Sequence, residues 1–245
     1  MIYTKPMQNN LLRVDFINCS VISNISKHYL KYIPEITKET KILFSRHELT
    51  YRSFLPLQLN KNENEIIDYL QKINKPQLHL EFMVNNNSSG YLDLILSDYS
   101  FNLWLNNLPE KIIELEISAL NEEPNFILHY THARCQSLLR LGIEEKIIKK
   151  EFYFTQRDWL QLNSIWEKKL FWQLLEITDN HIDHNSLLKL AQAIINFERN
   201  CRIWGDVKKN NLQITINRLA LVAFASYILN FIAKNLFAQE LLSEL

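Results

Sequence analysis

The stretch FILHYTHARCQSLLR, residues 126–140, predicts a long helix and opens a half of the chain that is helical almost throughout. Asn185 or Ser186 is the expected N-cap of one later helix, and Gly205 stands where that helix should stop. Apolar residues recur at helical spacing beyond the opening stretch. They predict further helices near 143–152, 155–178, 186–203 and 212–236.

The half of the chain that precedes this stretch indicates mixed α and β structure. Leu11 to Ile25 is apolar at helical spacing, and Glu63 to Ile73 predicts a second helix. The period then changes to two. Apolar residues that alternate with polar ones flank the turn-forming residues NNNSSG at 85–90, so the segment 77–97 predicts a β-hairpin.

Two prolines, Pro109 and Pro124, flank an acidic stretch that is the expected connector. We therefore expect an α+β domain over residues 1–108, a connector over 109–125 and a helical domain over 126–245. The expected fold class is mostly α: a small α+β N-terminal domain followed by an all-α helical bundle.

The composition excludes several classes of protein. The chain has 245 residues, with 27 Lys+Arg and 27 Asp+Glu, so bulk charge does not drive it onto nucleic acid. The charges are not evenly distributed, because basic residues outnumber acidic ones only in the second half, residues 126–245. Only three glycines occur, too far apart for a dinucleotide-binding or phosphate-binding loop, so we expect no nucleotide cofactor.

The cysteines and the apolar segments bear on the compartment. Cys19, Cys135 and Cys201 are odd in number and form no Cys-x-x-Cys pair, which favours a reducing compartment. The N-terminus has no apolar signal-peptide core, and the apolar run Leu219 to Leu229 falls short of a membrane span. We expect no membrane contact and a location in the bacterial cytoplasm or the plastid stroma.

The opening stretch resembles the Tyr-Ala-His-Ala-Arg helix of class I arginyl-tRNA synthetases. That helix begins the family's DALR anticodon-binding domain. The likeness continues through residues 186–204 and through 216–245, which resembles the family's final helix. The positions on the first pattern are Tyr130, His132, Ala133, Arg134, Ser137, Leu138, Leu139 and Arg140.

A second resemblance lies upstream. Residues 90–105, GYLDLILSDYSFNLWL, are similar to a strand near the end of the family's additional N-terminal domain, and 65–73 fits that domain's last helix. The family's nucleotide-binding domain would lie between the two matched regions, but only residues 106–125 separate them. The sequence has neither His-x-Gly-His nor Lys-Met-Ser-Lys-Ser. The resemblance therefore implies a protein that is not an enzyme and has no catalytic residues.

Tyr130 and Arg134 are the first candidate site. They are four residues apart on one helix face and can reach one partner. The resemblance implies contact with the tRNA anticodon region, where a ring stacks on an unpaired base and an arginine pairs with phosphate or base edges. The alternative is that Tyr130 belongs to the core and that Arg134 ties helix ends together.

Two acidic residues depart from the family pattern. Tyr91 matches an aromatic residue that packs near the tRNA elbow, but Asp93 replaces the neighbouring asparagine. Glu198 replaces the tyrosine that usually follows the position of Phe197. Carboxylates accept hydrogen bonds only and repel phosphate, so both would face the RNA if the family's docking mode is kept.

Arg140, Arg199 and Arg202 complete the candidate tRNA-binding set, as parts of a phosphate track beside Arg134 or of a solvated helix face. His129, His132 and Cys135 have the spacing of helical metal ligands. Successive ligands at this spacing turn away from one face, however, and no second cluster lies near them in the sequence. We therefore expect no metal site.

Two function classes remain open, with a third, weaker one beside them. The first is a non-catalytic arginyl-tRNA-synthetase-like protein that binds tRNA. The second is a helical scaffold for a protein partner that has lost RNA binding. The third is a trans-acting part of a split synthetase. The intact helix with Tyr130 and Arg134 favours the first, whereas the neutral charge, Asp93 and Glu198 favour the second.

Overall fold

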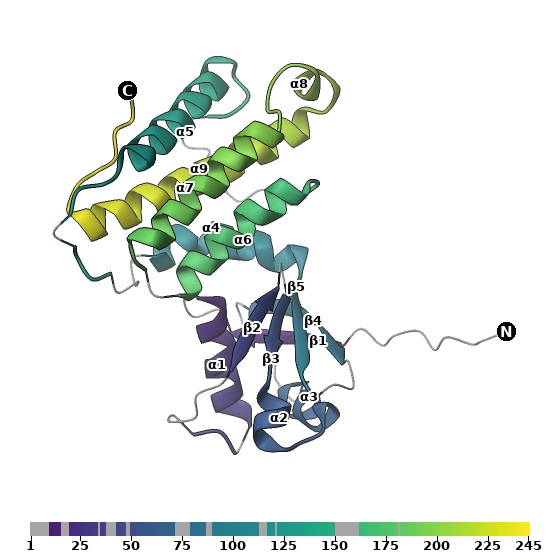
Figure 1. Cartoon of the computed structure of the whole chain (residues 1–245). Coiled ribbons are helices and arrows are strands. Elements are labelled where there is room, and N and C mark those ends of the chain that lie inside the picture. Colours follow the sequence, from purple (N-terminus) through teal and green to yellow (C-terminus); the bar gives the residue numbers. More distant parts are fainter. Residues whose placement is uncertain are drawn as a thin grey trace. The chain divides into compact units, whose positions relative to one another are not determined.

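A computed structural model describes residues 10–15, 20–33, 35–37, 43–47, 50–71, 79–86, 90–112, 117–120, 122–149, 162–180 and 182–245. The chain divides into two compact units, Met1–Trp104 and Leu105–Leu245, which are taken one at a time. The first is an α+β unit and the second is helical (Figure 1). The structure thus confirms the expected fold class, a small α+β part followed by a helical bundle.

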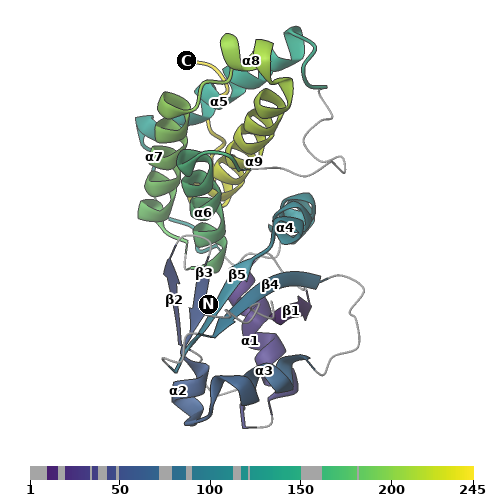
Figure 2. The same ribbon diagram turned by 90° about the vertical axis from the view of Figure 1, so that its right-hand side faces the viewer.

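The N-terminal unit is built on an antiparallel sheet with the strand order β1-β4-β5-β3-β2. Helix α1 packs against β1 and α3 (Figure 2). The core includes Tyr29, Tyr51 and Phe82, all fully buried. The strands are β1 (Asn10–Asp15), β2 (Phe44–His47), β3 (Thr50–Ser53), β4 (His79–Asn86) and β5 (Leu92–Leu96), and the helices are α1 (Val21–Tyr32), α2 (Leu55–Leu59) and α3 (Glu63–Gln71). Helix α4 (Asp98–Lys111) begins in this unit and continues past the division at Trp104.

The predicted hairpin is confirmed by β4 and β5, and the helix predicted at 63–73 is confirmed as far as residue 71. Residues 72–73, 77–78 and 87–89 of these two predictions lie outside the described part, and the helix predicted at 11–25 is wrong. Strand β1 occupies the first part of that segment and pairs with β4, and α1 begins only at Val21. The register sets Leu12 opposite Phe82, and the strand gains backbone hydrogen bonds along the edge that faces β4. The side chain of Ser20 then caps α1 by accepting from the backbone N–H of Ser23.

The helical unit consists of α5 (Phe126–Glu144), α6 (Ile165–Asp179), α7 (His184–Asn200), α8 (Asp206–Asn210) and α9 (Leu212–Phe237). Helix α9 packs against the other four, and Figure 1 shows α5 and α7 running along it. The helices predicted near 126–140, 186–203 and 212–236 are confirmed within a few residues.

Other predictions about helix limits need correction. Residues 145–149 form a turn rather than the start of a helix at 143–152, and α6 begins at Ile165, with residues 155–161 outside the described part. The N-cap of α7 is Asp183, whose carboxylate accepts from Ser186 N. Helix α7 ends at Asn200. Gly205 instead precedes α8 with a φ of 72°, a conformation that favours glycine.

The sequence predicted that the apolar run Leu219 to Leu229 is too short to span a membrane, and helix α9, which contains this run, requires a correction. By length and composition it could cross a membrane, with a mean hydropathy of 1.6 over its best window. However, 72% of that window is buried within the fold. A core helix passes the same test, so the pattern is weak support for a membrane span.

Candidate functional site

Helices α5 and α7 pack side by side and form a surface hollow of about 250 Å³ between them. The hollow unites Tyr130 and Arg134 of α5 with Arg199 of α7, all three predicted from the sequence. We call it the α5–α7 hollow. Its lining residues are Tyr130, Arg134, Ile195, Glu198 and Arg199.

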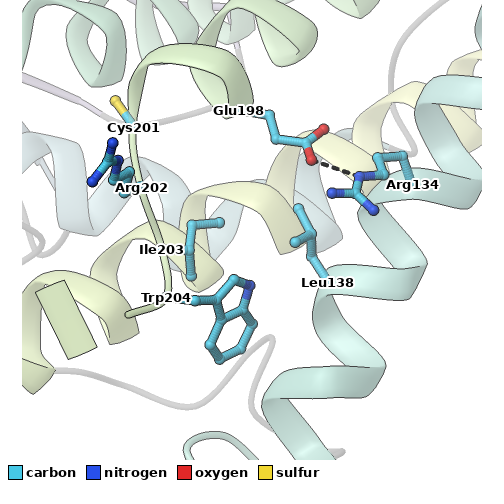
Figure 3. Close-up of a pocket in the computed structure, with 7 residues that line it drawn as sticks. All are labelled: Arg134, Leu138, Glu198, Cys201, Arg202, Ile203 and Trp204. Atoms are coloured by element: carbon cyan, nitrogen blue, oxygen red, sulfur yellow. Dashed lines mark hydrogen bonds and ion pairs between the residues drawn. The ribbon is translucent and has the colours of Figure 1, made fainter. Parts of the chain in front are cut away.

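A second hollow of about 220 Å³ shares Arg134 and Glu198 with the first. It extends along the loop after α7 and is lined by Arg134, Leu138, Glu198, Cys201, Arg202, Ile203 and Trp204. Figure 3 shows Glu198 reaching toward Arg134, whereas Arg202 points away from this pair on the other side of the loop. Arg202 thus borders the site without joining the ion pair at its centre.

The ion pair joins Arg134 Nε to Glu198 Oε1 at 2.5 Å. Their side chains are 48% and 24% exposed, so water screens the attraction and the pair adds little stability. Within the described residues, Glu198 Oε2 and the two terminal nitrogens of Arg134 make no hydrogen bond. The pair therefore leaves an acceptor and two donors available to a ligand.

Two aromatic residues lie on the first turns of α5, Tyr130 in the lining of the hollow and Phe126 next to Tyr130. Phe126 and Tyr130 are 72% and 43% exposed as whole residues, and their ring centroids lie 6.3 Å apart at an interplanar angle of 30°. Sequence reasoning left open whether Tyr130 is a core residue. Its exposure shows that it is not, and Phe126 is an exposed aromatic residue that sequence reasoning did not single out.

A buried ion pair anchors the loop that carries Arg202. Arg218 Nε donates to Glu167 Oε1 at 2.7 Å, and Arg218 Nη1 also donates to the carbonyl oxygen of Arg202. Glu167 Oε2 accepts in turn from the backbone N–H of Ser164 at 2.8 Å. The sequence did not predict this cluster around Glu167. The spacing of Ser164 and Glu167 is that of a capping box and could have indicated it.

Arg140 lies apart from the α5–α7 hollow and holds the last residues of the chain. Its Nη1 donates to the carbonyl oxygen of Ser243 at 3.2 Å and lies 3.3 Å from a carboxylate oxygen of Glu244. These contacts partly neutralise its charge. They make Arg140 a clamp for the C-terminal segment within this unit.

The histidines of the candidate metal pattern bind the same segment. His129 Nδ1 accepts from the N–H of Leu242 at 3.1 Å, and His132 Nδ1 lies 2.9 Å from the carbonyl oxygen of Leu242. Burial lowers the pKa of His132. Burial also raises the pKa of the Cys135 thiol to about 12. In the described part of the chain, no three His, Cys, Asp or Glu side chains converge as metal ligands.

Tyr91 lies in the N-terminal unit, in a cluster with Arg52 and Asp93. Arg52 donates to both carboxylate oxygens of Asp93, from Nε at 2.7 Å and from Nη2 at 3.0 Å. The guanidinium carbon of Arg52 stands 3.9 Å from the centroid of the Tyr91 ring. Asp93 therefore has an internal cationic partner, and one face of Tyr91 is covered.

Comparisons with family models, curated proteins and solved structures give no match to this chain.

Proposed function

We propose that the protein is a non-catalytic, arginyl-tRNA-synthetase-like protein that binds tRNA through the α5–α7 hollow. One observation carries the proposal: the exposed Tyr130, with the ring of Phe126 6.3 Å from its own, lines the same hollow as the exposed Arg134 and Arg199. Aromatic faces stack on unpaired bases and arginines hold the phosphates between them, which is how proteins bind single-stranded segments of RNA.

The charge of the surface sets the strength of such binding. Arg134, Arg199 and Arg202 are exposed cations, whereas Glu198 offsets one of them. A footprint of two to four phosphates implies a log–log salt dependence with a slope of about −2 to −3. Binding is therefore modest and sensitive to salt.

The proposal includes the absence of aminoacylation by this chain alone. The sequence contains neither of the two family motifs that hold ATP. The direct measurement is arginine-dependent exchange of pyrophosphate into ATP by protein freed of contaminating synthetase. Exchange above background would show that the chain is an enzyme.

Sequencing the RNA that co-purifies with the protein tests the binding function. We expect enrichment of tRNA over total cellular RNA, and loss of that enrichment in the double variant Tyr130→Ala, Arg199→Ala. Lys189→Ala is the matched control, because it removes an exposed cation from the same helix ten residues before Arg199. Absence of tRNA enrichment in the wild type would contradict the proposal.

The ion pair between Arg134 and Glu198 supports a second candidate function, a scaffold for a protein partner. An internal carboxylate that neutralises the central arginine reduces attraction to RNA, while the exposed ring of Phe126 offers apolar contact area. In the same purification, this function predicts a stoichiometric protein partner, no enriched RNA, and loss of the partner in Phe126→Ala.

A further inference from the structure

Glu198 gives the α5–α7 hollow a hydrogen-bonding preference that its arginines and its aromatic ring do not. An ionised carboxylate accepts hydrogen bonds and donates none, so it repels phosphate and attracts N–H groups. Its Oε1 accepts from Arg134, and each oxygen has two lone pairs, so both oxygens keep the capacity to accept from a ligand. Arg134 meanwhile fixes the position of the carboxylate at the edge of the hollow.

The four RNA bases differ in what they offer to such a carboxylate. Guanine presents two adjacent donors on its pairing edge, N1–H and the 2-amino group. Adenine and cytosine each place an amino group beside a ring nitrogen that accepts, and uracil places one N–H between two carbonyls. Only guanine matches two acceptor oxygens with two donors, without setting an acceptor against the carboxylate.

We propose that the α5–α7 hollow selects an unpaired guanine. The base stacks on Tyr130, its two donors bind Glu198, and the neighbouring phosphates lie against Arg199 and the terminal nitrogens of Arg134. The hollow, at about 250 Å³, is below the roughly 300–1,000 Å³ of sites for drug-sized ligands, which suits one base better than a large cofactor. This inference rests on the proposed function, since it names the base that the RNA presents.

Binding of short RNA oligomers measures the selectivity directly. The probes are uridine oligomers with one central guanosine, inosine or adenosine, titrated against the full chain at one fixed salt concentration. We expect guanosine to bind about ten-fold more tightly than adenosine, as for one well-formed bidentate base contact. Inosine keeps N1–H and lacks the 2-amino group, so its affinity should fall between the two.

Substitution of Glu198 tests whether this side chain makes the choice. Glu198→Gln keeps the shape and removes the charge, and we expect it to abolish the preference for guanosine without weakening binding of plain uridine oligomers. Glu144→Gln is the matched control, because Glu144 is an exposed carboxylate on α5 and lies about 15 Å along the helix from Arg134. This control should keep the full preference.

The possible outcomes separate the two proposals. Equal binding of all three oligomers by the wild type would overturn guanine selection and leave RNA binding intact. No binding of any oligomer or of tRNA would overturn both proposals. A preference that persists in a folded Glu198→Gln would remove Glu198 from the selection. If that variant does not fold, the inosine comparison in the wild type still decides whether the 2-amino group is read.

Discussion

The two units each contain a cluster of a tyrosine, an arginine and a carboxylate, and the two clusters are built in opposite ways. In the N-terminal unit, Arg52 binds Asp93 through two hydrogen bonds and lies over the ring of Tyr91. In the helical unit, Arg134 binds Glu198 through one hydrogen bond, and the ring of Tyr130 remains exposed.

Burial explains the difference. The side chain of Asp93 is 11% exposed and belongs to a central strand, so it needs a full complement of donors within the fold. Glu198 lies on a helix surface where water meets the same need. The same three residue types therefore make a closed, structural cluster in one unit and an open surface in the other, and we expect function to follow the open one.

The largest effect expected is on stability and concerns the closed cluster. Asp93→Ala should lower the free energy of unfolding by about 2–3 kcal/mol, because it removes two charge-assisted hydrogen bonds to a carboxylate that is only 11% exposed. Glu198→Ala should cost less than about 1 kcal/mol, as for an exposed pair. Urea unfolding followed by circular dichroism compares them, and equal losses would show that the two clusters are energetically alike.

The second prediction compares the two tyrosines in tRNA binding. Tyr130→Ala should weaken binding by about 1–3 kcal/mol through loss of a stacking face. Tyr91→Ala should leave affinity unchanged, because one face of that ring already carries Arg52. Filter binding at fixed salt measures both, with melting temperature as the control for folding. A larger loss for Tyr91→Ala would reverse the assignment of the two clusters.

The third prediction concerns Arg134, whose Nε is already occupied by Glu198. Arg134→Ala should weaken tRNA binding by about 1 kcal/mol. Removal of an arginine whose donors are all free to bind RNA would cost more. Arg134→Ala should also make the log–log salt slope shallower by about 1 if a phosphate contact is lost. A slope that does not change would show that Arg134 contacts no phosphate.

The smallest effect is a pH dependence from His132. Burial lowers the pKa of His132 in the folded state, so the unfolded chain binds its proton at higher pH. Its contribution to stability is complete above the unfolded pKa of about 6.5 and is lost as the pH falls toward the folded value. The urea midpoint of unfolding should therefore fall more between pH 7.5 and pH 5.5 in the wild type than in His132→Gln.

The sequence predicted the hairpin and the long helices because their signals are local. Alternating apolar residues and a turn-forming run lie together between 77 and 97, and the spacing of apolar residues predicts α9. The segment at 11–25 fits either period, and its strand forms because β4, far along the chain, supplies the partner. No local pattern contains that information.

The candidate site was partly predictable for the same reason. Tyr130 and Arg134 are four residues apart on one helix, so their proximity follows from helical geometry. The partners of Asp93 and Glu198, the two acidic residues that depart from the family pattern, depend on tertiary structure. Arg52 meets Asp93 through the register of β3 and β5, and Glu198 meets Arg134 through the packing of α7 on α5. Neither arrangement follows from spacing along the chain.

Helix α9 matters to how the chain is made as well as to how it is held. Its apolar residues are largely buried within this unit, so the helix needs the other helices to cover it. Helices α5, α6 and α7 precede it in the chain, so they leave the ribosome first and are present when α9 emerges. A variant that delays the folding of those helices would leave the apolar surface of α9 uncovered for longer, and such surface is prone to aggregation.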